Sequence, residues 1–367
     1  MSKAAELAAL IGSQTAQGNR NLIINGAMTI NQRGTQTGVR NSYGVDRFVI
    51  SGSGAQLFTY SQSTTVPSGQ GFSYSAKLDV TTADTSVAAG DYQLLIQRFE
   101  GQDLQQLKYG TSSAEPLTLQ FWVRSPKTGT HIVELTHVDA AYQNAQSYTV
   151  ASANTWQKVT LTFVGYQTTA ITNDNTNGFT INWWLMAGST YSGGTLASNT
   201  WQNTAANRAV GQVNVVDSTS NNFYLTGVQL EIGDVATAFE HRSFGNEYQR
   251  CLRYYYKTPA PNGGMSANET FPCIGNMDGS TTGAYMLQFP TPMRAAPTAF
   301  EQSGTASDYS IRVTSDANGT SVPTAGGFTA ESALINLVSS GAGFTSGDAC
   351  FMRAESTDAF LAFSAEL

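Results

Sequence analysis

The chain has 367 residues, of which 41% are hydrophobic and only 12% are charged. This length allows roughly two or three domains with sizeable cores, and the charged share is about half the ~25% typical of globular proteins, which argues against a typical cytosolic enzyme. The 19 basic and 26 acidic residues give a net charge of −7. This charge argues against binding to nucleic acid or to an anionic membrane, because binding to phosphate groups requires a positively charged protein surface.

The sequence contains no apolar stretch near the ~18 to 20 residues that span a bilayer. The apolar run at residues 7–11 is too short for a secretory signal. We therefore expect that the chain is synthesised in a cytoplasm and that it does not insert into a membrane. Cys251, Cys273 and Cys350 are too few and too dispersed for a disulfide framework or a structural zinc site. We expect three reduced, buried thiols.

Residues 1–14 are predicted to form a short helix, with Ser2 as its N-cap. The helix has one apolar stripe at the spacing i, i+3, i+4, i+7, formed by Ala4, Leu7, Ala8 and Ile11. A helix of two or three turns is marginal alone. We therefore expect residues 1–20 to dock on another protein or to oligomerise through this stripe.

Residues 21 to about 250 show a repeated pattern of strand, turn and strand. Alternating apolar and polar residues predict strands at residues 22–24, 47–50, 74–80, 92–97, 117–123, 131–138, 148–150, 158–164, 179–185 and 223–230. Residues 98–107 are predicted as a short helix or a loop. About ten strands in about 230 residues are typical of a β-sandwich or jelly roll.

A break in the pattern follows at residues 239–257, where residues 246–254 read as a helical turn or two and residues 254–256 as an aromatic strand. The Pro- and Gly-rich residues 259–264 predict a linker, and residues 265–367 form a second β pattern. The expected fold is all-β, a jelly-roll or β-sandwich domain with a short N-terminal helix and a second C-terminal β domain. The predicted divisions are 1–20, 21–258 and 262–367.

No recognisable catalytic motif is present: there is no Gly-x-Ser-x-Gly elbow, P-loop or His-Glu-x-x-His. His131 and His137 lie six residues apart in a predicted strand, too far apart for a compact metal site. Two pairs of neighbouring acidic residues, at 100/103 and 231/234, are predicted to cap turns or form ion pairs. We therefore expect no catalytic residue, no metal and no cofactor.

Aromatic residues make up 11% of the chain, and β-sandwiches bind sugars through exposed Trp or Tyr rings. Trp183 and Trp184 are adjacent in a predicted strand, so one faces inward and one outward. Tyr142, Tyr191 and Trp201 lie in polar, loop-like stretches. These three residues and Trp184 are the candidate ligand-binding residues; the alternative is packing at the core edge or contact between subunits.

Several strings resemble a family of phage virion proteins from marine and cyanobacterial podovirus-like viruses. They are AELAALIGSQTAQGNRNLIINGAM at 5–28, NQRG at 31–34, YGVDRF at 43–48, FWVRS at 121–125, TWQKVT at 155–160, FYLTGVQLEIGDVATAFEHRSFGNEYQRCLRYYY at 223–256, FPTPMRAAP at 289–297 and SAEL at 364–367. The resemblance implies a tail-fibre-like or structural protein with a jelly roll similar to carbohydrate-binding modules. It implies no ligand residues.

The leading hypothesis is a non-enzymatic virion protein, a short tail fibre or receptor-binding protein that contacts host surface polysaccharide. On this hypothesis it is assembled in the host cytoplasm, and its N-terminus holds another virion protein. The resemblance also implies a homotrimer. The alternatives are a capsid decoration or head-fibre protein and, from a different class, a polysaccharide-cleaving tailspike, which requires a carboxylate pair in a groove.

Overall fold

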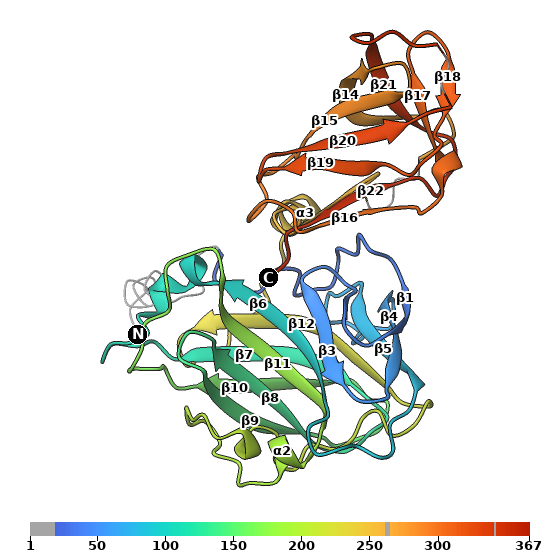
Figure 1. Cartoon of the computed structure of the whole chain (residues 1–367). Coiled ribbons are helices and arrows are strands. Elements are labelled where there is room, and N and C mark those ends of the chain that lie inside the picture. Colours follow the sequence, from blue (N-terminus) through green and yellow to red (C-terminus); the bar gives the residue numbers. More distant parts are fainter. Residues whose placement is uncertain (1–18, 261–264, 341–342) are drawn as a thin grey trace. The chain divides into compact units, whose positions relative to one another are not determined.

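The computed structural model describes residues 19–260, 265–340 and 343–367 (Figure 1). The predicted docking stripe of Ala4, Leu7, Ala8 and Ile11 lies outside these ranges. Internal contacts divide the chain between Glu247 and Tyr248, inside helix α3 (Phe244–Leu252), and group Leu367 with the first unit. The sequence places this boundary at residues 258–262 instead. Strand β13 (Tyr255–Thr258) falls in the second unit because it pairs with β22 (Leu361–Ser364).

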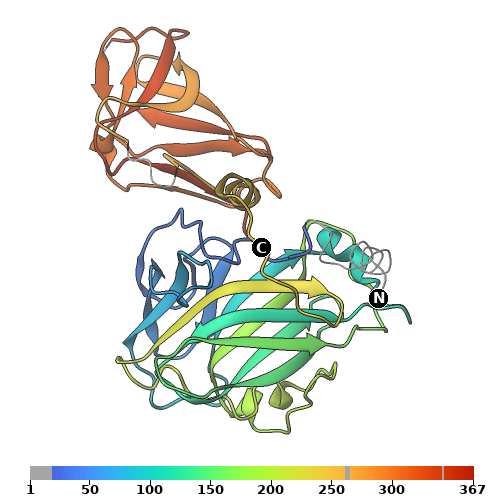
Figure 2. The ribbon, with the colours of Figure 1, turned by 180° about the vertical axis from the view of Figure 1, so that it is seen from behind.

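The first unit contains two six-stranded sheets of the β-sandwich class expected from the sequence. One has the order β1 (Gln36–Val39), β4 (Leu57–Ser63), β5 (Ser75–Thr82), β12 (Asn222–Ile232), β7 (Leu117–Arg124), β10 (Gln157–Phe163). The other has the order β2 (Ser42–Tyr43), β3 (Phe48–Ser53), β6 (Tyr92–Glu100), β11 (Asn177–Ala187), β8 (Gly129–His137), β9 (Tyr142–Val150). Figure 2 shows the first of these sheets, with β12 in yellow.

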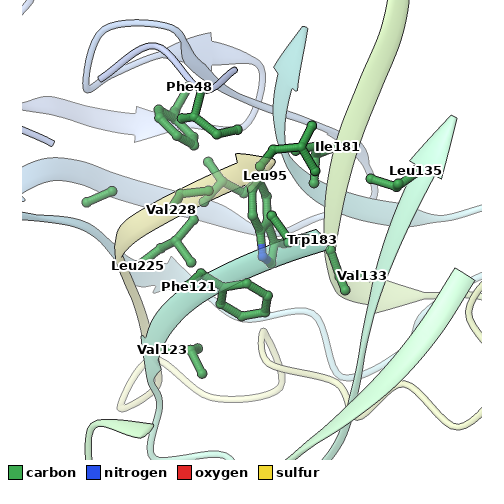
Figure 3. Close-up of a cluster of buried hydrophobic side chains, with 14 of the residues drawn as sticks. Phe48, Leu95, Phe121, Val123, Val133, Leu135, Ile181, Trp183, Leu225 and Val228 are labelled. Atoms are coloured by element: carbon green, nitrogen blue, oxygen red, sulfur yellow. The ribbon is translucent and has the colours of Figure 1, made fainter. Parts of the chain in front are cut away.

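Alternating side chains from the two sheets meet in one hydrophobic core (Figure 3). Trp183 of β11 is fully buried there, with its ring centroid 5.7 Å from Phe121 of β7 and 6.2 Å from Phe48 of β3. Burying aromatic side chains of this size contributes about 2 to 3 kcal/mol each. The period-two pattern at residues 117–123, 179–185 and 223–230 therefore identified core strands correctly.

The segment at residues 22–24, predicted as a strand, is not one. Leu22 donates a backbone hydrogen bond to Leu230 of β12, but the chain then turns at Asn25, whose φ is +63°. Within residues 98–107, predicted as a short helix or a loop, Gly101–Leu107 forms the 3-10 helix η2.

A buried polar cluster ties together segments far apart in sequence. The Asn25 side chain is fully buried; it donates to the carbonyls of Ile30 (2.8 Å) and Asp46 (3.0 Å), and it accepts from the Ile30 amide. The Asn25 amide donates to the Glu247 carboxylate (2.6 Å), and the Asp46 carboxylate accepts both hydrogen bonds from Gln32. Asn25, Gln32, Asp46 and Glu247 each lie in a different one of the strings that resemble the phage family, so these four strings meet in one structural element.

The second unit has a three-stranded sheet, β13, β22, β16 (Ala299–Gln302), and a seven-stranded sheet. The larger sheet has the order β18 (Asp316–Asn318), β17 (Tyr309–Arg312), β21 (Ala349–Ala354), β14 (Thr270–Asp278), β15 (Thr282–Gln288), β20 (Ser332–Val338), β19 (Thr324–Phe328). Its inner face buries Tyr285, Leu287 and Ile335. Cys251, Cys273 and Cys350 are buried, as predicted, and form no disulfide within the described ranges. Burial raises the pKa of the Cys273 thiol to about 12.

No helix within the described ranges is both long and apolar enough to cross a membrane.

Candidate ligand pocket

The outer face of the β2-β3-β6-β11-β8-β9 sheet carries the candidate site. Trp183 points into the sandwich core, and Trp184 points to the opposite face, as alternation in a strand requires. The segment after β11, with the short helices α2 (Ser189–Ser192) and η3 (Ala205–Asn207), contributes Tyr191 and Ala209 to the apolar cluster around Trp184. Trp184 therefore faces outward from the sheet, as predicted for one of the two tryptophans, yet it is only 1% exposed.

Trp184 forms one wall of an open pocket of about 200 Å³ whose other walls are Tyr92, Leu94, Tyr191 and Arg208. The Tyr191 ring lies 5.4 Å from the Trp184 ring and 5.6 Å from the Tyr92 ring. Drug-sized ligands occupy pockets of roughly 300 to 1,000 Å³. This pocket is smaller, so it fits a single ring-sized group.

Arg208 crosses the aromatic wall of the pocket. Its guanidinium carbon lies 5.3 Å from the Trp184 ring centroid and 5.8 Å from that of Tyr191, which are cation–π distances. Nε and Nη2 donate to the two carboxylate oxygens of Glu134 on β8, at 2.8 and 2.6 Å. Burial by itself lowers the pKa of Arg208, but the hydrogen bonds and charge of Glu134 outweigh it and hold that pKa above its ordinary value.

The Glu134 carboxylate is fully buried and belongs to a small network. Asn182 of β11 donates to it at 2.9 Å and Thr136 of β8 at 3.1 Å. A buried charge requires a partner and further hydrogen bonds, and this carboxylate has both. The ion pair fixes the Arg208 guanidinium in the pocket wall and leaves the wall neutral overall.

The indole Nε1 of Trp184 is a second distinctive feature of the wall. It is buried and has no hydrogen-bond partner within the described part of the chain. An unpaired buried donor costs about 1 to 3 kcal/mol.

The other two candidate residues lie apart from the pocket residues. Tyr142 and Trp201 both pack on Tyr166, at ring-centroid distances of 5.4 and 5.3 Å. Trp201 Nε1 donates to the Val164 carbonyl at 2.7 Å, and its ring lies 6.0 Å from Tyr109. This contact set corresponds to the core-edge alternative for these two residues. Only Trp184 and Tyr191 share the pocket.

His131, His137 and Glu231 have structural surroundings. His131 and His137 are both buried, and their Nε2 atoms lie 3.0 Å from the backbone carbonyls of Lys127 and Thr169. Glu231 accepts hydrogen bonds from Thr237 and lies 3.9 Å from Arg20. No group of three His, Cys, Asp or Glu side chains suited to a metal occurs within the described ranges.

Sequence reasoning missed Tyr92, Leu94, Arg208 and the supporting Glu134. Glu134 did give a signal: it is a charged residue in the middle of the otherwise apolar run HIVELTHV, and such a residue requires a buried partner. Its partner is 74 positions away. No local pattern identifies Arg208 as that partner.

Comparisons with known proteins give likenesses of fold only. No family model and no curated protein matches the sequence. The enzymatically active domain of bacteriophage CBA120 tailspike protein 4 superposes with a TM-score of 0.31 at 14% identity. The match covers 58% of this chain but only 21% of the tailspike chain, so this chain spans about a fifth of the tailspike's length. The family 11 carbohydrate-binding module of Clostridium thermocellum Lic26A-Cel5E has a TM-score of 0.27 at 12% identity, over 57% of this chain and 98% of that one. The module TmCBM61, solved with β-1,4-galactotriose, has a TM-score of 0.27 at 10% identity, over 58% and 99%. No pocket residue is assigned from these structures.

Proposed function

We propose that the chain is a non-enzymatic virion protein, a short tail fibre or receptor-binding protein that contacts a host surface glycan. The observation that carries the proposal is the pocket between Tyr92, Trp184, Tyr191 and Arg208. The virion setting rests on the resemblance of the strings at 31–34, 43–48 and 223–256 to phage proteins.

The chemistry of the pocket walls suits an uncharged sugar ring. Aromatic faces pack against the C–H groups of a pyranose, and neighbouring polar groups bind its hydroxyls. Tyr191 offers such a ring, and Arg208 presents donors beyond the Nε and Nη2 that bind Glu134. Because Glu134 already neutralises Arg208, the pocket has no net charge to attract an acidic sugar. We therefore expect neutral glycans to be preferred over uronic acids.

Binding in so small a pocket is expected to be weak for one copy of the chain. Attachment proteins compensate by presenting several copies, because linked sites raise the overall avidity by roughly 10² to 10⁴ without new contacts. A shallow, single-ring site is thus compatible with firm attachment of a whole particle.

The competing tailspike hypothesis requires two carboxylates about 5 to 10 Å apart across the bound sugar. Glu134, the carboxylate next to the pocket, is fully buried and already bound by Arg208 and Asn182. Its position suits support of the pocket wall rather than proton transfer to a sugar.

The test is a binding screen of the purified full-length protein against neutral and acidic oligosaccharides and host surface polysaccharide. We expect saturable binding to a neutral glycan, competition by that glycan, and no new reducing ends after prolonged incubation. Binding without competition, or no binding to any glycan, would contradict the proposal. New reducing ends would support the tailspike hypothesis instead.

A further inference from the structure

The seven-stranded sheet of the second unit leaves large apolar side chains exposed on its outer face. Nine large hydrophobic side chains are exposed within the described part of the chain, and five lie on this face: Ile274, Met286, Leu334, Val338 and Phe351. Ile274 is 68% exposed and Met286 52%. Scattered exposed apolar residues are normal, but a contiguous patch marks an interaction surface.

Strand register places four of these residues in one row. Phe351 of β21 pairs with Ile274 of β14, which pairs with Met286 of β15, which pairs with Leu334 of β20. Directly opposed residues have Cβ atoms about 4.5 to 5.5 Å apart. The four side chains therefore form a continuous apolar ridge across the middle of the sheet; we call it the outer ridge.

The surroundings of the outer ridge contain few charges. The outer-face neighbours two positions along the strands include Asn276, Ala284 and Asn336, which are uncharged. Charged groups begin beside Phe351, at one end of the ridge: Arg312 of β17 and Arg353 of β21 both pair with Asp316 of β18, at 2.8 and 2.7 Å. An apolar, charge-depleted centre with a polar rim is the usual anatomy of a protein–protein interface.

We infer that the outer ridge is an interface between two copies of this chain. Two observations favour a second copy as the occupant. The four side chains of the outer ridge are uncharged, so two like ridges meet without charge repulsion. Moreover, seven strands about 4.8 Å apart and about 20 Å long present roughly 700 Å² on one face, close to the ~800 Å² per partner of a stable interface.

The symmetry of such a pair follows from the row. Most homo-oligomers are closed and symmetric, and a two-fold pair uses the same patch on both copies. A two-fold axis parallel to the strands sets Phe351 against the partner's Leu334 and brings Ile274 and Met286 to the centre. The assignment is independent of the glycan pocket, which lies in the first unit.

Sedimentation velocity of the full-length protein tests the assignment. We expect a wild-type species of at least twice the 39.1 kDa chain mass and dissociation to a smaller species in the double variant I274D/M286D. V235D is the matched control, because Val235 is 67% exposed but lies in the first unit; it should keep the wild-type mass. A monomeric wild type, or a double variant with the wild-type mass, would overturn the assignment.

Cross-linking gives a second readout that does not require dissociation. The three native cysteines are buried, so a cysteine at the exposed position 286 is the principal target of a short bismaleimide. The variant M286C should yield a covalent dimer at low protein concentration, and V235C should not. Equal cross-linking of the two variants, or none in M286C, would also refute the interface.

Discussion

Removal of the Arg208 side chain is the sharpest test of how the pocket is built. In R208M the Glu134 carboxylate, fully buried in the wild type, loses two of its four side-chain hydrogen bonds and its counter-charge. Removing one partner of a buried ion pair typically costs about 3 to 5 kcal/mol, because the other charge remains uncompensated. Since Arg208 is 21% exposed, we expect a loss near the lower end, about 3 kcal/mol.

Urea unfolding followed by tryptophan fluorescence isolates this effect. All five tryptophans precede residue 248, so the signal reports on the first unit alone. With an m-value of about 3 kcal/mol/M, the midpoint of R208M should fall by about 1 M. The double variant E134Q/R208M removes both charges and should recover most of the loss. A cost of R208M below about 1 kcal/mol, or a double variant no more stable than the single, would refute a desolvated ion pair in the pocket wall.

Three further predictions concern the first unit. In a titration with a bound neutral glycan, Y191A should weaken binding by about tenfold or more with little change in stability, since Tyr191 is half-buried and contributes a ring face. Burial lowers the pKa of His131 and of His137, so the unfolded chain takes up protons near pH 6.5 that the folded chain does not. The free energy of unfolding should fall from pH 7 to pH 5 by at most about 1.4 kcal/mol per pH unit per histidine. H131F should reduce this slope, and an unchanged slope would contradict a lowered pKa of His131 in the folded chain. Replacement of Asn25 should cost about 3 kcal/mol in N25G through its lost buried hydrogen bonds. N25A should cost about 1 kcal/mol more because φ is +63°; equal unfolding free energies of the two variants would refute the role of backbone conformation.

The strands were predictable because their signal is local. Alternation at residues 117–123 and 179–185 directly predicts strands with one buried face, and it separates Trp183 from Trp184. The segment at 22–24 is not a strand because its backbone bonds to separate partners rather than to one neighbouring strand: Leu22 binds Leu230, and Ile24 binds the Gln97 side chain. A short apolar run carries no information about such partners.

The pocket was only half predictable for the same reason. Trp184 and Tyr191 are aromatic residues near one strand end, and composition alone drew attention to them. Their assembly into a pocket depends on Arg208 and Glu134, which come from a loop and a strand 74 positions apart. Tyr142 and Trp201 have similar sequence surroundings, yet they pack on Tyr166 instead. Local context therefore does not distinguish a pocket wall from a core edge.

We propose that the pocket between Tyr92, Trp184, Tyr191 and Arg208 binds a neutral sugar ring. The most direct test is calorimetric titration of the best neutral oligosaccharide into the wild type, Y191A and Y142A. We expect saturable binding by the wild type, at least tenfold weaker binding by Y191A, and wild-type affinity for Y142A, whose ring lies outside the pocket. Equal affinity of the wild type and Y191A, or a selective loss in Y142A, would contradict it.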